Sequence, residues 1–172
     1  MNLNDLAINY YHESLALAQK AMISGITVSV IAYLVAIVGI GKASYVIPFV
    51  GIEVESLSYF SISLLCLYFA CGMLCLHGMN KALFNWQQIS DHELSAHLLH
   101  TPNILMSGII FKAFLYGALF TVGSGLSAQI LNISGWKVFL VGSIVCFPYF
   151  YALRLQSYFE KPAITKSAEN PN

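Results

Sequence analysis

Residues 104–131 read ILMSGIIFKAFLYGALFTVGSGLSAQIL, and this stretch decides the fold class. It carries a single charge, on Lys112, and it is longer than the about 20 apolar residues that a helix needs to cross a bilayer. The runs 21–41, 57–76 and 136–153 are similarly apolar, and Lys137 holds the only charge within them. We therefore expect an all-α integral membrane protein with four transmembrane helices in one bundle.

The composition agrees with this class. Hydrophobic residues make up 58% of the chain and charged residues 9%, against about 45–50% and about 25% in soluble domains. The chain contains no Pro/Gly/Ser-rich linker, so we expect one folded unit, the bundle over 21–155. The net charge of zero and the lack of a basic patch in the sequence argue against nucleic-acid binding.

Residues 1–20 are expected to form an N-terminal amphipathic helix, because apolar residues recur at helical spacing with polar residues between them. Asn4 is a candidate N-cap, and Asp5 suits the positive end of the helix. No helix breaker separates this segment from the first span, so the two are expected to form a continuous helix. Residues 1–19 carry no Lys or Arg, and we expect the segment not to be a cleaved signal.

Lysine and arginine in short flanking segments predict the orientation, because they resist translocation across the membrane. With four spans, both termini lie on one side. The positive residues on that side are Lys20, Lys81, Arg154, Lys161 and Lys166, and those on the other side are Lys42 and Lys137. We expect the termini and the connection 77–103 to be cytoplasmic, in an inner or plasma membrane, and 156–172 to be a disordered cytoplasmic tail.

The connection 77–103 is the most polar part of the chain, and it is predicted to hold one short cytoplasmic helix. Ser90 and Glu93 are spaced as in a capping box, in which each side chain accepts from an amide near the helix N-terminus. Pro102 stops the helix, because the residue before a proline avoids helical geometry. We expect the helix over 91–100.

Three side chains of this short helix form a candidate metal site. Glu93, His97 and His100 follow one another at spacings of four and three, so they offer two histidines and one carboxylate on one face. The alternative, which we favour, is a solvated polar face over leucines that rest on the lipid headgroups. The sequence shows no further ligand near this set, and we expect no cofactor.

The cysteines Cys66, Cys71, Cys75 and Cys146 all lie inside predicted spans. The chain has no C-x-x-C pair, and reactive cysteines are found near water rather than in an apolar core. We expect them to be small buried hydrophobic side chains.

Lys112 is the residue whose position within a span should be costly. If the third span begins at residue 104, Lys112 lies about 12 Å deep, where a lysine costs roughly 2.5–3.5 kcal/mol. We favour a shift of the helix that lets the ammonium reach the cytoplasmic boundary. The alternative is a water path lined by Lys112 and Gln129 with Thr121 and Ser124, or a charge for another subunit.

Small residues recur every four positions on the third span, at Ala113, Gly117, Thr121 and Gly125. Such an edge lets a neighbouring helix approach closely, so we expect it to be a packing interface, within one chain or between copies. The looser edge on the first span, its candidate partner, consists of Gly25, Ser29, Ala32, Ala36 and Gly39. Leu115 and Phe120 fall off the edge of the third span, and we expect substitutions there to matter less.

Residues 42–56 are too apolar for a free loop. The alternation over 52–55, after the turn residues 48–51, predicts a small extracytoplasmic hairpin on the outer end of the bundle. Glu53 and Glu55 would share a face, and we expect them to keep an apolar strip in water rather than bind a cation.

Enzyme motifs are absent from the sequence: it contains no G-x-S-x-G, P-loop or G-x-G-x-x-G pattern and no acidic residue within a span. We therefore expect a non-enzymatic interaction, anchoring or accessory subunit of a membrane assembly. Its partners would be the lipid bilayer and another membrane protein or a second copy of the chain. The alternative is a small homo-oligomeric channel or transporter with Lys112 on the water path.

Overall fold

The structure is a computed structural model, and it describes residues 3–38, 44–47, 49–55, 57–90, 92–100 and 103–168. In chain order the elements are α1 (Leu3–Val38), β1 (Tyr45–Val46), β2 (Glu53–Val54), α2 (Leu57–Gln87), α3 (His92–Leu98), the 3-10 turn η1 (Ile104–Met106), α4 (Ile109–Leu131) and α5 (Trp136–Ala168). Within the described residues, α1, α2, α4 and α5 each contain a segment long and apolar enough to cross a membrane. These four candidate spans indicate a multi-pass membrane protein.

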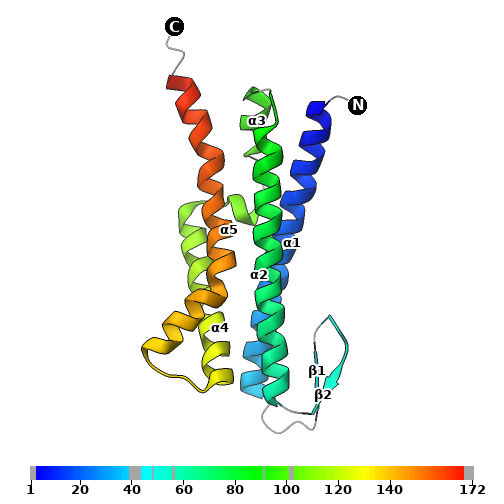
Figure 1. Cartoon of the computed structure of the whole chain (residues 1–172), viewed down its shortest axis with the longest axis vertical. Helices are drawn as coiled ribbons and strands as arrows, with labels where there is room; N and C mark the ends of the chain where they lie inside the picture. Colours follow the sequence, from blue (N-terminus) through cyan, green and yellow to red (C-terminus); the bar gives the residue numbers. More distant parts are fainter. Residues whose placement is uncertain are drawn as a thin grey trace.

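The four long helices pack alongside one another (Figure 1). α1 makes its most extensive contact with α2, α5 packs against both α2 and α4, and the contact between α1 and α4 is small. The start of α1, the short helix α3 and the last turns of α5 lie together at what we call the α3 end. The strands β1 and β2 lie at the opposite, hairpin end. α4 is the shortest of the four helices, at 23 residues, and it does not reach the α3 end.

Three helices extend further than the apolar runs predict. α1 joins the amphipathic segment and the first span in one helix of 36 residues, as the lack of a breaker suggested. α2 continues to Gln87, well past the expected end of the second span at residue 76. α5 continues to Ala168, so 156–168 are helical where the sequence predicted a disordered tail. Polar residues extend these helices beyond the apolar runs, because hydropathy marks a span and not a helix end.

The third long helix begins later than predicted, at Ile109 rather than residue 104. The Asn103 side chain accepts a hydrogen bond from the Leu105 amide at 2.9 Å, which closes the 3-10 turn η1. Ser107 and Gly108 are then extended, with ψ angles of 161° and 165°, so the chain leaves helical geometry before α4 starts. Lys112 consequently lies in the first turn of α4.

The short connection between α4 and α5 uses two residues with positive φ. Asn132 ends α4 in the left-handed region, with φ 49°, and its amide donates to the Ala128 carbonyl. Gly135 has φ 65° and immediately precedes α5. Asparagine and glycine tolerate this conformation better than other residues, which lets the two helices return antiparallel.

The predicted hairpin is confirmed. β1 and β2 pair antiparallel, with Tyr45 opposite Val54 and Val46 opposite Glu53. Beyond the strands, the Ile47 amide donates to the Ile52 carbonyl at 2.8 Å. The hairpin folds back beside α2 instead of lying across the end of the helices (Figure 1).

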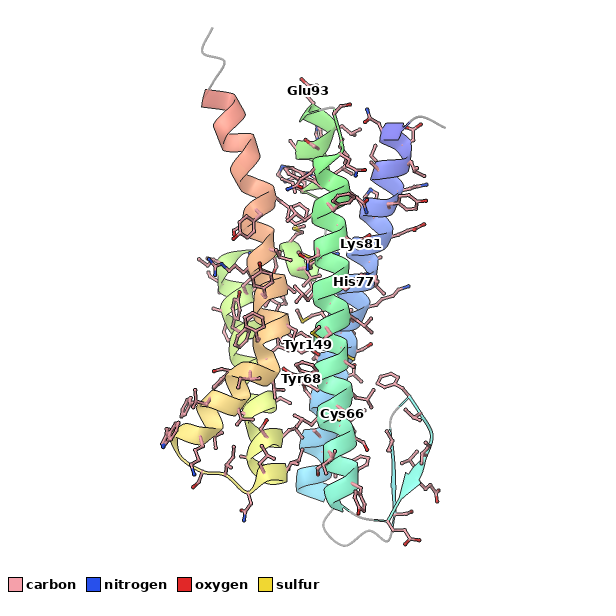
Figure 2. All side chains as sticks on the ribbon, viewed as in Figure 1. Cys66, Tyr68, His77, Lys81, Glu93 and Tyr149 are labelled. Atoms are coloured by element: carbon pink, nitrogen blue, oxygen red, sulfur yellow. The ribbon has the colours of Figure 1, made fainter. Side chains whose placement is uncertain are left out.

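The core is rich in large aromatic side chains at the helix contacts. Those that are almost completely buried are Tyr11, Phe60, Tyr68, Tyr149 and Phe159. Figure 2 shows Tyr68 and Tyr149 where α2 and α5 meet. Three of the cysteines are buried as expected, whereas Cys66 faces outward from α2.

Polar contacts at the α3 end differ from the predicted caps. Asn4 lies within the first turn of α1, and its side chain bonds to Ser90 instead of capping its own helix: the Asn4 amide nitrogen donates to the Ser90 hydroxyl at 2.9 Å. Asn85 of α2 donates to Ser14 of α1 at 3.4 Å. Residue 91 of the predicted capping box lies outside the described residues, and α3 begins at His92. These bonds join the outer turns of α1 to α2 and to the segment before α3.

Candidate functional site

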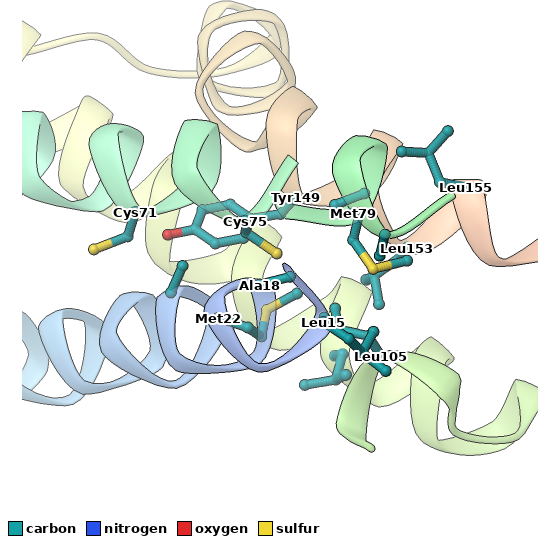
Figure 3. Close-up of a cluster of buried hydrophobic side chains, with 14 of the residues drawn as sticks. Leu15, Ala18, Met22, Cys71, Cys75, Met79, Leu105, Tyr149, Leu153 and Leu155 are labelled. Carbon is teal, nitrogen blue, oxygen red and sulfur yellow. The ribbon is translucent and has the colours of Figure 1, made fainter. Parts of the chain in front are cut away.

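Close packing is found around the Tyr149 side chain, where α1, α2 and α5 meet. The Tyr149 hydroxyl donates to the Tyr68 carbonyl oxygen at 2.7 Å, and the two rings lie 4.9 Å apart between centroids. A Cβ at Gly72 of α2 would lie 2.8 Å from the Tyr149 ring, and a Cβ at Gly25 of α1 would collide with its hydroxyl. Figure 3 shows the ring lying between α1 and α2 beside Cys75. The two glycines therefore provide the space that the tyrosine fills.

A second set of hydrogen bonds joins α2, α4 and α5. The Tyr68 hydroxyl donates to the Leu119 carbonyl of α4 at 2.8 Å, and the Cys146 thiol of α5 donates to the same oxygen at 3.3 Å. A Cβ at Gly123 would collide with the Cys146 sulfur, so α4 and α5 approach closely only because residue 123 is glycine. Each buried polar atom in this set of contacts has a hydrogen-bond partner, because an unpaired polar group is costly in apolar surroundings.

The short helix α3 is held in the same way, by aromatic donors. The Trp86 indole donates to the Ser95 carbonyl at 3.1 Å, and the Tyr11 hydroxyl donates to the Leu98 carbonyl at 3.4 Å. Leu98 is buried, and through these two hydrogen bonds α3 packs on the outer turns of α1 and α2. These two aromatic side chains connect α3 to α1 and α2, and both are buried.

The proposed metal set is not assembled. Glu93, His97 and His100 are all exposed, and His100 lies in the turn after α3 has ended. Among the residues that the structure describes, no group of three or more His, Cys, Asp or Glu side chains could hold a metal ion. The sequence predicted a helix over 91–100, which would place His100 on the same face as Glu93 and His97. Because α3 ends at Leu98, His100 is not held on that face.

The small-residue edge of the third span, which we call the α4 edge, is exposed. Ala113, Gly117, Thr121 and Gly125 are all exposed, and a Cβ added at Gly117 or Gly125 would meet nothing within 4 Å. The expected packing of this edge against the first helix is therefore not made over its length. Within one chain, α4 packs through its opposite face.

The two small-residue edges approach each other only near one open groove. Ser29 and Ala32 of α1 and Thr121 and Gly125 of α4 line this groove, whose volume is about 260 Å³. Gly25 serves a different contact, the one with Tyr149. The remaining members of the α1 edge, at 36 and 39, lie outside the described side chains.

Of the two residues chosen from the sequence as lying off the α4 edge, Leu115 belongs to the core. Leu115 is 7% exposed, and Phe120 is half-buried with its ring 5.8 Å from that of Phe139 on α5. Because Leu115 is buried, we now expect its substitution to matter more than the spacing suggested. Spacing identified the small edge correctly but assigned it to the inside of the molecule.

Lys112 lies apart from Gln129, the other polar end of the candidate water path. Lys112 lies in the first turn of α4 and Gln129 near its end, and the helical rise of 1.5 Å per residue separates them by about 26 Å. Ser124 is buried and donates to the Thr121 carbonyl at 3.2 Å, and Thr121 donates to the Gly117 carbonyl. Both hydroxyls are thus bonded within α4, while Thr121 and Gln129 line the same open groove between α1 and α4.

Basic residues of all four long helices lie at one level. Gly25, Gly72 and Tyr149 mark a common height on α1, α2 and α5, because they meet at the tyrosine junction. Five residues further toward the α3 end, these helices carry Lys20, His77 and Arg154. On α4, Leu119 lies opposite Cys146 of α5, which places Lys112 within about one helical turn of the same level.

We call Lys20, His77, Lys112 and Arg154 the basic level. Lys20, His77 and Arg154 are exposed, and Lys112 is half-buried. Figure 2 shows His77, with Lys81 one turn beyond it, near the height at which α4 begins. The sequence predicted Lys20 and Arg154 to lie on one side of the membrane, but the common height of all four residues depends on how the helices are paired.

No protein-family model, no curated protein and no solved structure matches this chain.

Proposed function

We propose that this protein is a non-enzymatic accessory or anchoring subunit of a membrane assembly, and that it binds a partner transmembrane helix at the α4 edge. The observation that carries this proposal is the outward position of that edge, with open space beside Gly117 and Gly125. In lipid, apolar burial provides no net drive between helices, so close van der Waals approach along small residues supplies much of the attraction. A small edge that is unused within the chain therefore suits a helix from outside.

Membrane insertion of the four helices as one bundle is part of the proposal, and the helix lengths support it. From His77 to Tyr59 on α2, and from Arg154 to Trp136 on α5, the helical rise spans about 27 Å in each case. This matches a hydrocarbon core of about 30 Å. Basic side chains then lie at one boundary, and exposed Tyr59 and Trp136 form an aromatic belt at the other.

The groove between α1 and α4 adds to the docking surface. It continues the α4 edge toward α1 and is lined mainly by small and apolar side chains. The partner helix would contact Gly117 and Thr121 and place a side chain in the groove beside Gly125. Another membrane protein and a second copy of the chain both satisfy this chemistry, and the mass of the complex distinguishes them.

The channel alternative receives less support from the same geometry. Lys112 and Gln129 lie at opposite ends of α4, and the hydroxyls between them are bonded to the α4 backbone. A water path would have to form between copies of the chain. No contact among the described residues favours such a path.

The first prediction concerns orientation. Because Lys and Arg are concentrated toward the α3 end, that end is expected to be cytoplasmic. An alkaline phosphatase fused after Ala168 should be inactive, and one inserted in the hairpin turn at Val50 should be active. The reverse pattern would show that the proposed orientation is wrong.

The second prediction compares one substitution at two glycines of α4. Gly117→Leu should leave the thermal stability of the isolated chain nearly unchanged, because the added side chain meets open space. It should weaken association with the partner by roughly 1–3 kcal/mol, the usual cost of overpacking a contact. Native mass spectrometry of the gently extracted complex measures the association.

Gly123→Leu is the matched control on the same helix. Its side chain would collide with Cys146, so the isolated chain itself should lose thermal stability. If Gly117→Leu lowers the stability of the isolated chain as much as Gly123→Leu, the α4 edge is an internal contact. If Gly117→Leu leaves the complex intact, the edge is not the docking surface.

A further inference from the structure

Two cations of the basic level face the same seam, the one between α4 and α5. The Tyr116 and Phe150 rings meet there with centroids 5.0 Å apart, and the Tyr116 hydroxyl donates to the Phe150 carbonyl at 3.3 Å. Lys112 precedes Tyr116 by four residues, and Arg154 follows Phe150 by four. Since the two helices are antiparallel, both cations lie one turn beyond the ring contact, on the same side of the molecule.

Contacts and helix geometry support this placement. The Arg154 guanidinium lies near enough to the Tyr116 phenol of α4 for the two to interact electrostatically. α4 begins next to Lys112, and its N-cap, Gly108, makes no side-chain capping bond. The positive end of the helix dipole therefore adds to the two side-chain charges.

The surface on the membrane side of Arg154 is apolar. Phe147 and Tyr151 lie seven and three residues before Arg154 on α5, toward the hairpin end. Both side chains are exposed, and their rings stack with centroids 5.8 Å apart. The seam thus combines positive charge with an exposed apolar surface on its membrane side.

We propose that Lys112 and Arg154 bind the phosphate of an anionic lipid headgroup at the cytoplasmic end of the α4–α5 seam. A lysine supplies a point charge and an arginine a planar fork of donors, and both are suited to phosphate oxygens. A lipid fits better than a soluble phosphate, because the exposed Phe147 and Tyr151 on the membrane side of Arg154 can contact acyl chains. This inference rests on the proposed membrane insertion, but it is independent of docking at the α4 edge.

Binding is tested by native mass spectrometry of the full chain in detergent with added dioleoyl phosphatidylglycerol or dioleoyl phosphatidylcholine. The wild type should retain the anionic lipid more tightly than the zwitterionic one. Lys112→Gln and Arg154→Gln should each weaken phosphatidylglycerol binding by about fivefold, because each removes one cation that attracts an anionic headgroup. If the two contributions add in free energy, the double variant should weaken binding by about 25-fold. Phosphatidylcholine binding should change little.

Two other lysines provide matched controls. Lys137→Gln removes an exposed cation at the hairpin end, and Lys81→Gln removes one on the cytoplasmic side but outside the seam. Neither should weaken phosphatidylglycerol binding by more than about twofold. Equal losses in Lys81→Gln and the seam variants would show general attraction by surface charge and would overturn the site.

Retention of phosphatidylglycerol by the double variant at the wild-type level would also overturn it. If the double variant does not fold, the wild type decides the question, because raising the salt concentration should release phosphatidylglycerol before phosphatidylcholine. Arg154→Lys keeps the charge and should restore most of the binding lost in Arg154→Gln. The same spectra report the mass of the protein complex, so failure of the docking proposal is seen separately from failure of the lipid site.

Discussion

Replacing Tyr149 with alanine is expected to lower the free energy of unfolding by about 3 kcal/mol, the lower end of the range for removing a large aromatic side chain from a core. The ring is fully buried and fills the space left by Gly25 and Gly72, so its loss leaves a cavity bordered by three helices. Part of the usual hydrophobic term is absent in lipid, but the lost van der Waals contacts remain. Equilibrium unfolding in mixed micelles with increasing dodecyl sulfate measures the change.

Tyr149→Phe is the control for this substitution, because it keeps the ring and removes only the hydroxyl. It breaks the hydrogen bond to the Tyr68 carbonyl and should lower the free energy of unfolding by about 1 kcal/mol or less. If Tyr149→Ala costs no more than Tyr149→Phe, the ring does not hold the three helices together. In that case the junction is not a centre of stability.

Gly78→Leu is expected to separate α1 from α2 and to lower the free energy of unfolding by about 3 kcal/mol, the upper end of the usual range for overpacking. A Cβ at Gly78 would lie 2.8 Å from the Ala18 backbone nitrogen and 2.9 Å from the Ser14 carbonyl oxygen. Backbone atoms of a helix cannot rotate away as a side chain can, so α1 must move as a whole. The contact between α1 and α2 is the most extensive in the chain.

Gly117→Leu again provides the comparison, because it adds the same side chain to a helix at a position with no neighbour within 4 Å. A leucine is a better helix former than glycine by less than about 1 kcal/mol, so the collision at Gly78 outweighs this gain. Thermal unfolding followed by circular dichroism in detergent measures both variants. Equal melting temperatures for Gly78→Leu and the wild type would contradict the close approach of α1 and α2.

A buried tyrosine is expected to form a hydrogen bond, but the sequence does not show which atom accepts it. Tyr68 and Tyr149 were not singled out from the sequence, although a tyrosine hydroxyl within an apolar span needs an acceptor. Their acceptors are backbone carbonyls, which carry no signature in the sequence. The glycines opposite the rings, Gly25 and Gly72, stand on other helices and lack a repeat that would link them to the tyrosines.

The sequence by itself determined the class of the protein, its four long apolar helices, the hairpin before α2 and the clustering of basic residues toward one end. These are local properties, since hydropathy, turn residues and charge can be read along the chain without knowing its neighbours. The ends of the helices were less well predicted, because α1, α2 and α5 continue into polar sequence. Contacts such as Asn4 with Ser90 join those outer turns.

Only the tertiary structure decided which face of each helix lies inside. In a soluble protein the polar face identifies the outside, but a span that faces both lipid and other helices is apolar all round. For this reason the spacing identified the α4 edge and yet misplaced it, and it assigned Leu115 to the wrong side. The common level of Lys112 and Arg154 arises in the same way, because it exists only once α4 and α5 are paired antiparallel at Tyr116 and Phe150.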